Sequence, residues 1–215
     1  MKREIDLNDV SDGKLYENND LVKADCFGCE NCHKCCTGMG ESIVLDPFDV
    51  YNLSLSTGKS FEKLLESNIE INIVDGLTLP NINMKNGECT FLQDGRCSIH
   101  SFRPGICRMF PLGRIYNDDG FKYFLQVYEC PVKNKGKVKV KKWLGYPDIN
   151  GYEAYINTWH GLIVDLQNNL PDLSEDNVRV LNLLIIKTFY QTEYNDDFFD
   201  EFYKRVTQIR NMLGI

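Results

Sequence analysis

The chain has 215 residues, of which 43% are hydrophobic and 12% aromatic, and its net charge is −7. This length and composition can bury an ordinary core, which excludes a disordered chain and a mini-domain that needs staples to fold. The excess of acidic residues argues against a general nucleic-acid-binding protein. The N-terminus lacks the apolar segment of a secretory signal, and no stretch approaches the roughly 20 apolar residues of a membrane-spanning helix. We therefore expect a cytoplasmic protein that contacts no membrane.

The N-terminal segment and the first long helix have local signals. Residues 1–25 are polar and are expected to form an extended or loosely packed arm. Asp46 followed by Pro47 is typical of a helix start, with Asp46 as the N-cap and Pro47 at the first helical position. This helix is expected to close near Gly58.

A second short helix and two hairpins are expected before residue 130. Residues 60–67 support a helix capped by Ser60. Apolar and polar residues alternate on both sides of Asp75-Gly76, which predicts a β-hairpin. A cysteine-bearing loop follows over 86–111, and the turn over 117–120 is expected to join two further strands.

A lysine-rich stretch begins at residue 133 with the sequence KNKGKVKVKKW. Lys137, Lys139 and Lys141 alternate with valines, as in an exposed edge strand whose charges discourage aggregation. The alternative interpretation is a surface that meets an anionic partner.

The pattern is helical from about residue 150 onward. Helices are expected over 151–170, ending at Pro171, over 175–190, capped by Ser174, and over 196–213. In the last helix, apolar residues recur at spacings of four, four and three, which predicts one face packed against the core. That face consists of Phe198, Phe202, Val206 and Ile209.

Together these elements predict an α+β fold. It should consist of an irregular cysteine-rich metal-binding body with short antiparallel strands and a helical C-terminal half. We expect three parts: a polar N-terminal arm over 1–25, a cysteine-cluster metal-binding domain over 26–148, and C-terminal helices over 149–215 packed on it.

Cysteine is the residue type that carries the chemistry. In a reducing compartment cysteines point to metal before disulfides, and an odd number of them cannot pair completely. Disulfide staples, a metal or iron–sulfur centre and a catalytic thiol are the competing interpretations, and no residue singles out a catalytic thiol. The nine cysteines are Cys26, Cys29, Cys32, Cys35, Cys36, Cys89, Cys97, Cys107 and Cys130.

Cys29, Cys32 and Cys35 follow one another with two residues between neighbours. Such a tight turn brings thiolates within about 4 Å of each other, as a tetrahedral metal with sulfur ligands at about 2.3 Å requires. The same spacing reaches three corners of an iron–sulfur cube, and Cys130 before Pro131 has the form of the remote ligand in bacterial ferredoxins. The pattern favours an iron–sulfur cluster and leaves zinc open.

Cys35 and Cys36 are adjacent in the sequence. Neighbouring side chains of an extended strand point to opposite faces. The pair is therefore expected to serve two neighbouring sites, or to supply one ligand and one thiol beside the site. Cys89, Cys97 and Cys107 would complete whichever site the first loop leaves open.

Two segments, FGCENCHKCCTGMG and GECTFLQDGRCSIHSFRPGICRMFP, carry a resemblance to a known family. They resemble the CxxCxxCC cysteine-cluster family, described as a zinc- or iron-chelating domain, over roughly residues 27–131. The resemblance implies that the family's cysteines bind metal in this chain. The family's motifs fall on Cys29, Cys32, Cys35, Cys36, Cys89, Cys97, Arg103, Pro104, Cys107, Arg108, Phe110, Pro111 and Cys130.

Three positions depart from the family pattern or lie outside it. Cys26 lies outside the motif, His33 stands where relatives often carry glycine, and His100 stands where they often carry an aromatic residue. Cys97-x2-His100 has zinc-like spacing, so His100 is either a ligand or a packing residue, and His33 is a further candidate ligand. His160 is expected to be a surface or packing residue.

The surroundings of the cysteines suggest supporting roles. Arg103 and Arg108 flank Cys107 and would stabilise the negative charge of a thiolate-bound centre, or would form ordinary salt bridges. Aromatic and sulfur side chains nearby would limit solvent access to the centre. They are Phe91, Phe102, Met109 and Phe110.

Several functions fit this pattern. The first is an iron–sulfur or mixed-metal protein for redox or group-transfer chemistry. The alternatives are a non-catalytic zinc-stapled module that contacts a protein partner, and a metal-handling protein. Relatives such as the bacterial flagellin lysine methylases add S-adenosylmethionine-dependent methyl transfer, for which this chain shows no glycine-rich strand–helix turn. Gly38 and Gly40 are expected to serve turn geometry.

Overall fold

Short antiparallel strand pairs form the β part of the protein. The computed structural model describes residues 6–27 and 32–215. In this part of the chain, one sheet has three strands in the order β1-β10-β9, and the other sheets have two strands each. The strands are β1 (Ser11–Tyr16), β2 (Leu21–Asp25), β3 (Ile69–Val74), β4 (Leu77–Ile82), β5 (Met84–Lys85), β6 (Glu88–Cys89), β7 (Leu92–Gln93), β8 (Arg96–Cys97), β9 (Leu112–Asn117), β10 (Gly120–Gln126) and β11 (Gly136–Lys139).

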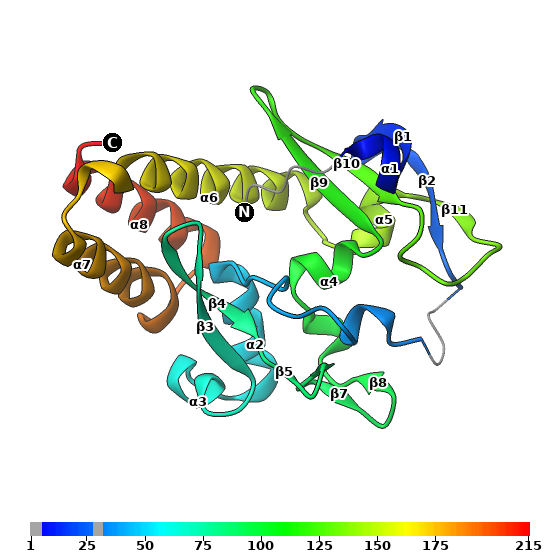
Figure 1. Ribbon diagram of the computed structural model, residues 1–215, viewed down its shortest axis with the longest axis horizontal. Helices are drawn as coiled ribbons and strands as arrows, with labels where there is room; N and C mark the ends of the chain where they lie inside the picture. The colour runs from blue at the N-terminus through cyan, green and yellow to red at the C-terminus, as the bar shows by residue number, and fades with distance from the viewer. Residues whose placement is uncertain (1–5, 28–31) are drawn as a thin grey trace.

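Helices supply the rest of the regular structure, so the predicted α+β fold with a helical C-terminal half is confirmed (Figure 1). Within the described ranges, no helix combines the length and apolar character needed to cross a bilayer. The helices are α1 (Leu7–Val10), α2 (Pro47–Thr57), α3 (Phe61–Leu65), α4 (Gly105–Met109), α5 (Val140–Leu144), α6 (Ile149–Asn169), α7 (Glu175–Ile186) and α8 (Phe198–Leu213), with shorter helical turns η1 (Lys34–Cys36), η2 (His100–Phe102), η3 (Leu170–Asp172) and η4 (Lys187–Gln191).

The predicted helix starts are confirmed because they depend on local hydrogen bonds. The Asp46 side chain accepts from the backbone N–H of Asp49, and the Asp49 side chain accepts from Asp46 in return, which completes a capping box for α2. Ser60 caps α3 and Ser174 caps α7 through the serine hydroxyl, which accepts from the backbone N–H three residues on. Each cap satisfies backbone donors that the first helical turn leaves free.

Both predicted hairpins are present. The β3–β4 hairpin turns at Asp75 and Gly76, which adopt φ angles of 48° and 85°. The β9–β10 hairpin turns over 117–120, with Asn117 paired to Gly120. Positive φ at the centre of a tight turn matches the right-handed twist of the strands on either side.

Residues 11–25 differ from the expected loosely packed arm. They are extended, but β1 pairs with β10 and β2 pairs with β11. Val22 and Ala24 are fully buried, because alternate residues of a strand share one face. The apolar residues of this mostly polar segment therefore fasten it to the body.

The lysine-rich stretch is only partly a strand. Lys137 and Lys139 lie on β11, an edge strand paired with β2, as expected. The chain then enters α5, so Lys141 is helical and not part of the strand. Burial of Val140 and Leu144 on α5 accounts for the change, since these two side chains reach the core from one helix face.

The C-terminal helices pack against each other and against α2. The apolar face predicted on α8 is buried, with Phe198, Phe202, Val206 and Ile209 all at most 4% exposed. Tyr155 of α6 donates a hydrogen bond to the Asp46 carboxylate at the start of α2. Figure 1 shows α6 running alongside α8, with the β9–β10 hairpin crossing near one end of α6.

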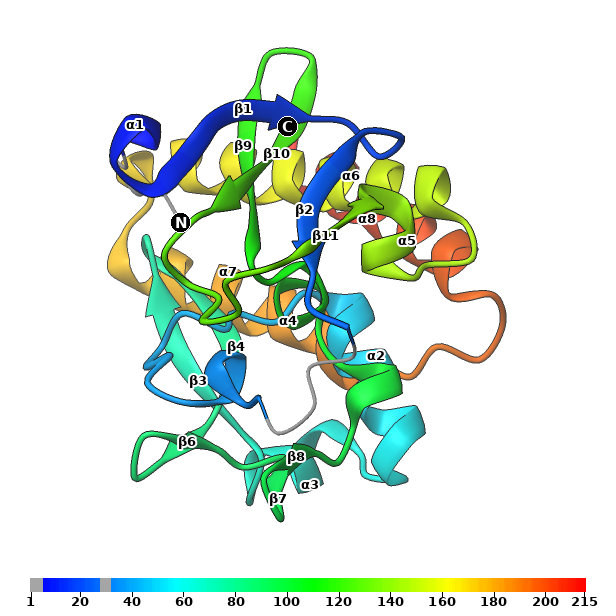
Figure 2. The ribbon, with the colours of Figure 1, turned by 90° about the vertical axis from the view of Figure 1, so that its right-hand side faces the viewer.

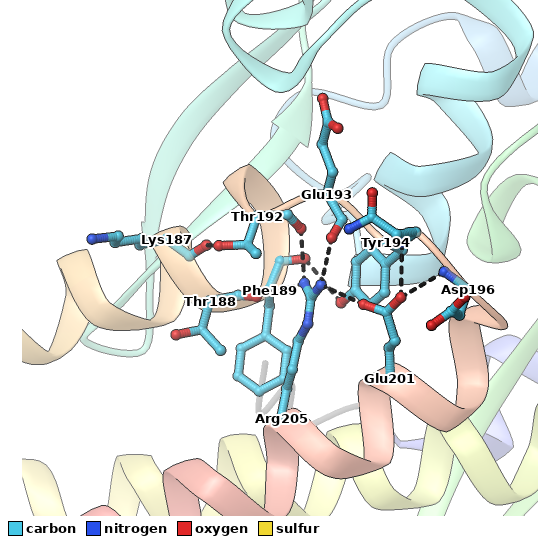
Figure 3. A network of polar contacts seen from close by, with 10 residues as sticks. Lys187, Thr188, Phe189, Thr192, Glu193, Tyr194, Asp196, Glu201 and Arg205 are labelled. Carbon is cyan, nitrogen blue, oxygen red and sulfur yellow. Dashed lines mark hydrogen bonds and ion pairs between the residues drawn. The ribbon is translucent and has the colours of Figure 1, made fainter.

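A buried arginine joins α8 to the end of α7 (Figure 3). The chain leaves α7 through the π-helical turn η4, which leaves carbonyl groups without helical partners. The Arg205 guanidinium also lies 3.7 Å from the centroid of the Tyr194 ring. Arg205 donates hydrogen bonds of 2.6–2.9 Å to the carbonyls of Thr188, Thr192 and Glu193 and to the carboxylate of Glu201.

Candidate metal centre

One cavity of about 350 Å³ gathers cysteine side chains from segments far apart in the sequence. All eight cysteines that the structure describes line it, and no disulfide joins any two of these eight. They are Cys26, Cys32, Cys35, Cys36, Cys89, Cys97, Cys107 and Cys130. Figure 2 shows η1 close to the small hairpins that carry β6 and β8. The predicted ligand Cys29 lies outside the described residues.

Four of these thiols form one contact group. The Sγ atoms of Cys35 and Cys36 are 3.9 Å apart. Cys36 also interacts with the thiols of Cys89 and Cys97, and these interactions raise its pKa. Sulfurs that bind one tetrahedral metal at about 2.3 Å stand about 3.8 Å from each other. The Cys35–Cys36 separation is therefore suitable for two ligands of one centre.

The short separation of the two sulfurs shows that Cys35 and Cys36 do not point to opposite faces. The expectation of opposite faces assumed an extended chain, whereas both residues lie on the 3-10 turn η1. The turn is closed by a hydrogen bond of 2.8 Å from the Cys36 N–H to the His33 carbonyl. The following loop is tied to a hairpin by a bond of 2.8 Å from the Gly38 N–H to the Gly87 carbonyl. Both sulfurs of the adjacent pair thus reach the same cavity.

Two small hairpins present Cys89 and Cys97 in a region predicted to be a loop. Their turns are Asn86-Gly87 and Asp94-Gly95, and all four residues have positive φ. Asn-Gly and Asp-Gly pairs are strong signals for two-residue hairpin turns, so the sequence could have revealed them. Their strands are only two residues long, too short to show a period-2 pattern. In each hairpin the cysteine stands two residues after the glycine.

Hydrogen bonding within the contact group changes thiol acidity. The bond from Cys36 is the main cause that lowers the pKa of Cys35 to about 7 and that of Cys97 to about 6, and it also lowers the pKa of Cys89. The pKa of Cys36 is raised, mainly because it acts as the hydrogen-bond partner of Cys35. The nearby Arg103 charge lowers the pKa of Cys35 and Cys97 further. The group therefore favours thiolates, the form that binds metal.

Cys107 occupies a different environment. It lies on α4, and burial raises its pKa well above the ordinary value. The start of α4 is held by a hydrogen bond of 2.8 Å from the Gly105 N–H to the buried Asp49 carboxylate. Cys107 lines the cavity with the other cysteines, but a bound cation is needed to favour its thiolate.

Arg103 lines the cavity and carries an unpaired donor. Its Nε atom is shielded from solvent and has no hydrogen-bond partner in the described part of the chain. One of its two terminal nitrogens, Nη1, lies 3.0 Å from Nε2 of His100. A shielded donor without a partner is costly, and a thiolate-bound centre is an anionic acceptor that would satisfy it. The residues present therefore fit a metal–thiolate group.

The other candidate residues are placed differently. Arg108 does not line the cavity; its guanidinium donates to the carbonyls of Leu144 and Ser101. His100 lines the cavity, and His33 does not. His160 stacks on Tyr116 with ring centroids 3.5 Å apart, which agrees with the expected packing role.

The apolar surroundings are partly as expected. Phe91 and Phe110 line the cavity, whereas Phe102 is 39% exposed and Met109 is buried on another side of α4. Trp143 of α5 completes the wall and donates its indole N–H to the carbonyls of Met109 and Phe110. These rings limit the access of water to the cavity.

The sulfurs surround an open space and do not converge on a point. Across residues 6–27 and 32–215, no three Cys, His, Asp or Glu side chains form a ready-made arrangement for a single ion. The eight cysteines are instead distributed around the walls of the cavity.

Comparison with known proteins defines the class of this site. Residues 28–131 match the model of a family described as "CxxCxxCC: Putative zinc- or iron-chelating domain". The resemblance drawn from the cysteine motifs is therefore confirmed over those residues. The finding supports chelation of zinc or iron as the general function of this segment and leaves the two metals undistinguished.

A relative is found among the curated proteins. It is an uncharacterized protein, MJ0939, of Methanocaldococcus jannaschii, and it is 27% identical over 120 residues. The match covers 54% of this chain and 40% of that protein, so it spans less than half of the relative's length. No solved structure matches the chain.

Proposed function

We propose that the cavity holds an iron–sulfur cluster bound by cysteine thiolates, and that the cluster supports redox or group-transfer chemistry. The observation that carries the proposal is the distribution of eight cysteines around a single cavity of about 350 Å³. A single tetrahedral ion draws four sulfurs together and leaves no open space between them. This cavity instead has the volume of about a dozen water molecules, which suits a polynuclear group.

The contact group and its neighbours are the first candidates to bind the cluster. Cys36 already interacts with Cys35, Cys89 and Cys97, and Cys107 lies within electrostatic range of that group. Cys26, Cys32 and Cys130 line the same cavity, and we include Cys32 and Cys130 as further ligands. When bound, such a cluster supplies an acceptor and donor of single electrons.

The protein residues around the site have defined tasks. Arg103 offers its free Nε–H to the thiolates and offsets their negative charge. Phe91, Phe110 and Trp143 exclude water from the sulfur atoms. The backbone N–H of Phe91 lies 3.5 Å from the Sγ of Cys89 and donates to it, which favours the thiolate form.

A zinc-stapled interaction module is the second candidate. The 3.9 Å separation of the Cys35 and Cys36 sulfurs favours it, because this is close to one edge of a tetrahedral zinc–thiolate site. In this case the metal would join η1 to the hairpins of β6 and β8, and its binding energy would be folding energy.

Metal content and spectroscopy distinguish the two. The full chain should be purified without oxygen and analysed for iron, acid-labile sulfide and zinc, with Mössbauer spectra of iron-57-enriched protein. The proposal predicts iron and sulfide in similar amounts and broad absorbance near 400 nm. Stoichiometric zinc in a colourless protein would support the stapled module, and the absence of both metals would refute both candidates.

A further inference from the structure

A second cavity, of about 590 Å³, lies next to the thiol cavity. Cys35, Cys107 and Phe110 line both cavities. The volume lies within the range of small-molecule sites in proteins. Nothing in the metal chemistry proposed above uses this cavity.

The cavity is elongated along α6. Ile156, Trp159, Ile163 and Gln167 line it, at the spacing of one helix face. Its opposite wall includes Leu112 and Arg114 of β9. Arg114 contacts Tyr152, and Gln167 stands 15 residues further along the helix, which corresponds to about 22 Å. An elongated molecule is therefore the natural occupant.

Arg114 is a shielded cation without a counter-ion in contact. Its Nη2 atom donates a hydrogen bond of 2.8 Å to the Tyr152 hydroxyl, and the guanidinium lies over the Phe121 ring, 5.3 Å from the ring centroid. Its Nε atom is shielded from solvent and has no hydrogen-bond partner, and Arg114 forms no ion pair with any described residue. Burying an unpaired charge away from water costs free energy, so an anionic acceptor bound to this donor would stabilise the site.

Three carboxylates line the cavity; that of Glu129 is exposed, and the other two are already engaged elsewhere. Asp46 accepts from the Asp49 N–H and the Tyr155 hydroxyl, and Asp49 accepts from the N–H groups of Asp46 and Gly105. These bonds cap α2 and hold the start of α4, so the two carboxylates cannot turn to pair with Arg114 without breaking them. Their negative charge also disfavours a dianion such as phosphate beside Arg114. A single carboxylate matches the single guanidinium better, because the two planar groups can form parallel hydrogen bonds.

The Arg114 end of the cavity lies next to the cysteines. A Cβ atom at Gly105 would stand only 2.3 Å from the Tyr152 hydroxyl that Arg114 binds, so α4 and Arg114 touch the same hydroxyl from two sides. Cys107 lies two residues after Gly105 on α4. A group held by Arg114 is thus placed close to sulfurs that also face the thiol cavity.

We infer that the second cavity binds an elongated organic monocarboxylate, with its carboxylate on Arg114 and its apolar body along Ile156, Trp159 and Ile163. Such a ligand lies against Cys35 and Cys107. Its use as a substrate of a metal centre there rests on the proposed function, whereas its binding does not.

Calorimetric titration of the full chain, purified without oxygen, tests the inference. Hexanoate and octanoate are the probes, with the neutral isosteres hexanamide and octanamide and inorganic phosphate as comparisons. We expect the carboxylates to bind about tenfold or more tightly than their amides, because the amides cannot form the charge-assisted hydrogen bonds. Phosphate, which lacks the apolar body, should not bind.

Substitution locates the carboxylate. Arg114→Met should weaken hexanoate binding about tenfold or more, and Arg114→Lys, which keeps the charge without the planar fork, should weaken it less. The exposed Arg179→Met serves as the charge-matched control and should bind like the wild type. Circular dichroism checks that each variant folds, and the wild-type comparison of acid with amide decides the matter if Arg114→Met does not fold.

Three results would overturn the inference. The acids could bind no more tightly than the amides, or no probe carboxylate could bind at all. The third is a folded Arg114→Met variant with unchanged affinity for hexanoate. Metal content is measured on the same samples. A metal-loaded protein that ignores carboxylates refutes this inference alone, whereas a metal-free protein that binds them through Arg114 refutes only the proposed function.

Discussion

Arg103 places a guanidinium beside thiols whose acidity it increases. Its charge lowers the pKa of Cys35 and Cys97, and its Nε donor has no other partner in the described chain. A positive charge next to a redox centre favours the reduced, more negative state. The residue therefore links the geometry of the site to a measurable potential.

Replacing Arg103 by Met should lower the midpoint potential of the iron-loaded protein by roughly 60 mV. A loss of about 1.4 kcal/mol of attraction shifts a one-electron couple by about 59 mV. Arg179→Met removes the same charge from an exposed position on α7 and should leave the potential unchanged. A redox titration that gives Arg103→Met the wild-type potential would contradict this role.

Cys97 and its neighbour Ser98 form a matched pair on one hairpin. Cys97 lines the thiol cavity, whereas the Ser98 hydroxyl donates to the Phe91 carbonyl. Cys97→Ala should reduce the bound metal per chain severalfold, because it removes a thiolate of the contact group. Ser98→Ala should keep the metal and lose about 1 kcal/mol of stability. Elemental analysis of both purified variants checks this, and full metal content in Cys97→Ala would exclude Cys97 as a ligand.

At the scale of elements, Arg205 holds α8 to the end of α7. Arg205→Met leaves shielded carbonyl groups without donors, so it should cost about 2–4 kcal/mol of unfolding free energy. Arg210 offers a matched comparison on the same helix, since its pair with Asp165 is 32% and 41% exposed. Arg210→Met should cost about 1 kcal/mol or less. Urea denaturation measures the unfolding free energy of both variants. An equal loss in the two would contradict the larger contribution expected of Arg205.

Glu201 gives the same region a pH dependence. Its carboxylate accepts from the backbone N–H of Asp196 and of Asn195, each at 2.7 Å, and from Arg205. The bond from Asp196 is the main cause that lowers the pKa of Glu201. A lowered folded-state pKa means that this stabilisation is present above the ordinary glutamate pKa of about 4.3 and is lost as the pH falls through the folded value.

Glu201→Gln should therefore flatten the acid side of the stability profile. Thermal unfolding of the wild type and the variant between about pH 6 and pH 3 measures the difference. The two curves should be furthest apart near neutral pH and should approach each other in acid. A constant gap across this range would show that the Glu201 charge does not contribute.

At the scale of the whole molecule, the sequence predicts local structure such as caps and turns, but it does not predict which distant segments come into contact. The caps at Asp46 and Ser174 and the turn at Asp75-Gly76 depend on a few neighbouring residues, so the sequence was sufficient to predict them. The joint orientation of Cys35 and Cys36 depended on a 3-10 turn that the cysteine spacing does not specify. The sequence also gave no sign that Arg114 would meet Tyr152, because a strand and a helix far apart in the chain create that contact.

The motifs predict that the cysteines share one region, and the eight cysteines that the structure describes all line one cavity. Their role as metal ligands remains a prediction. The volume of the cavity and the shielded Arg103 donor could not be foreseen, since both depend on how η1, the small hairpins and α4 pack together. The division into an arm, a cysteine-cluster domain and C-terminal helices remains a prediction, as does a cytoplasmic location.

The central claim is that cysteine sulfurs from separate segments bind one metal group in the thiol cavity. Metal-edge X-ray absorption fine structure of the full chain, purified without oxygen, measures this directly. The account predicts a first coordination shell dominated by sulfur at about 2.3 Å, whether the metal is iron or zinc. A shell of nitrogen and oxygen at about 2.0–2.2 Å, or a protein without stoichiometric metal, would contradict it.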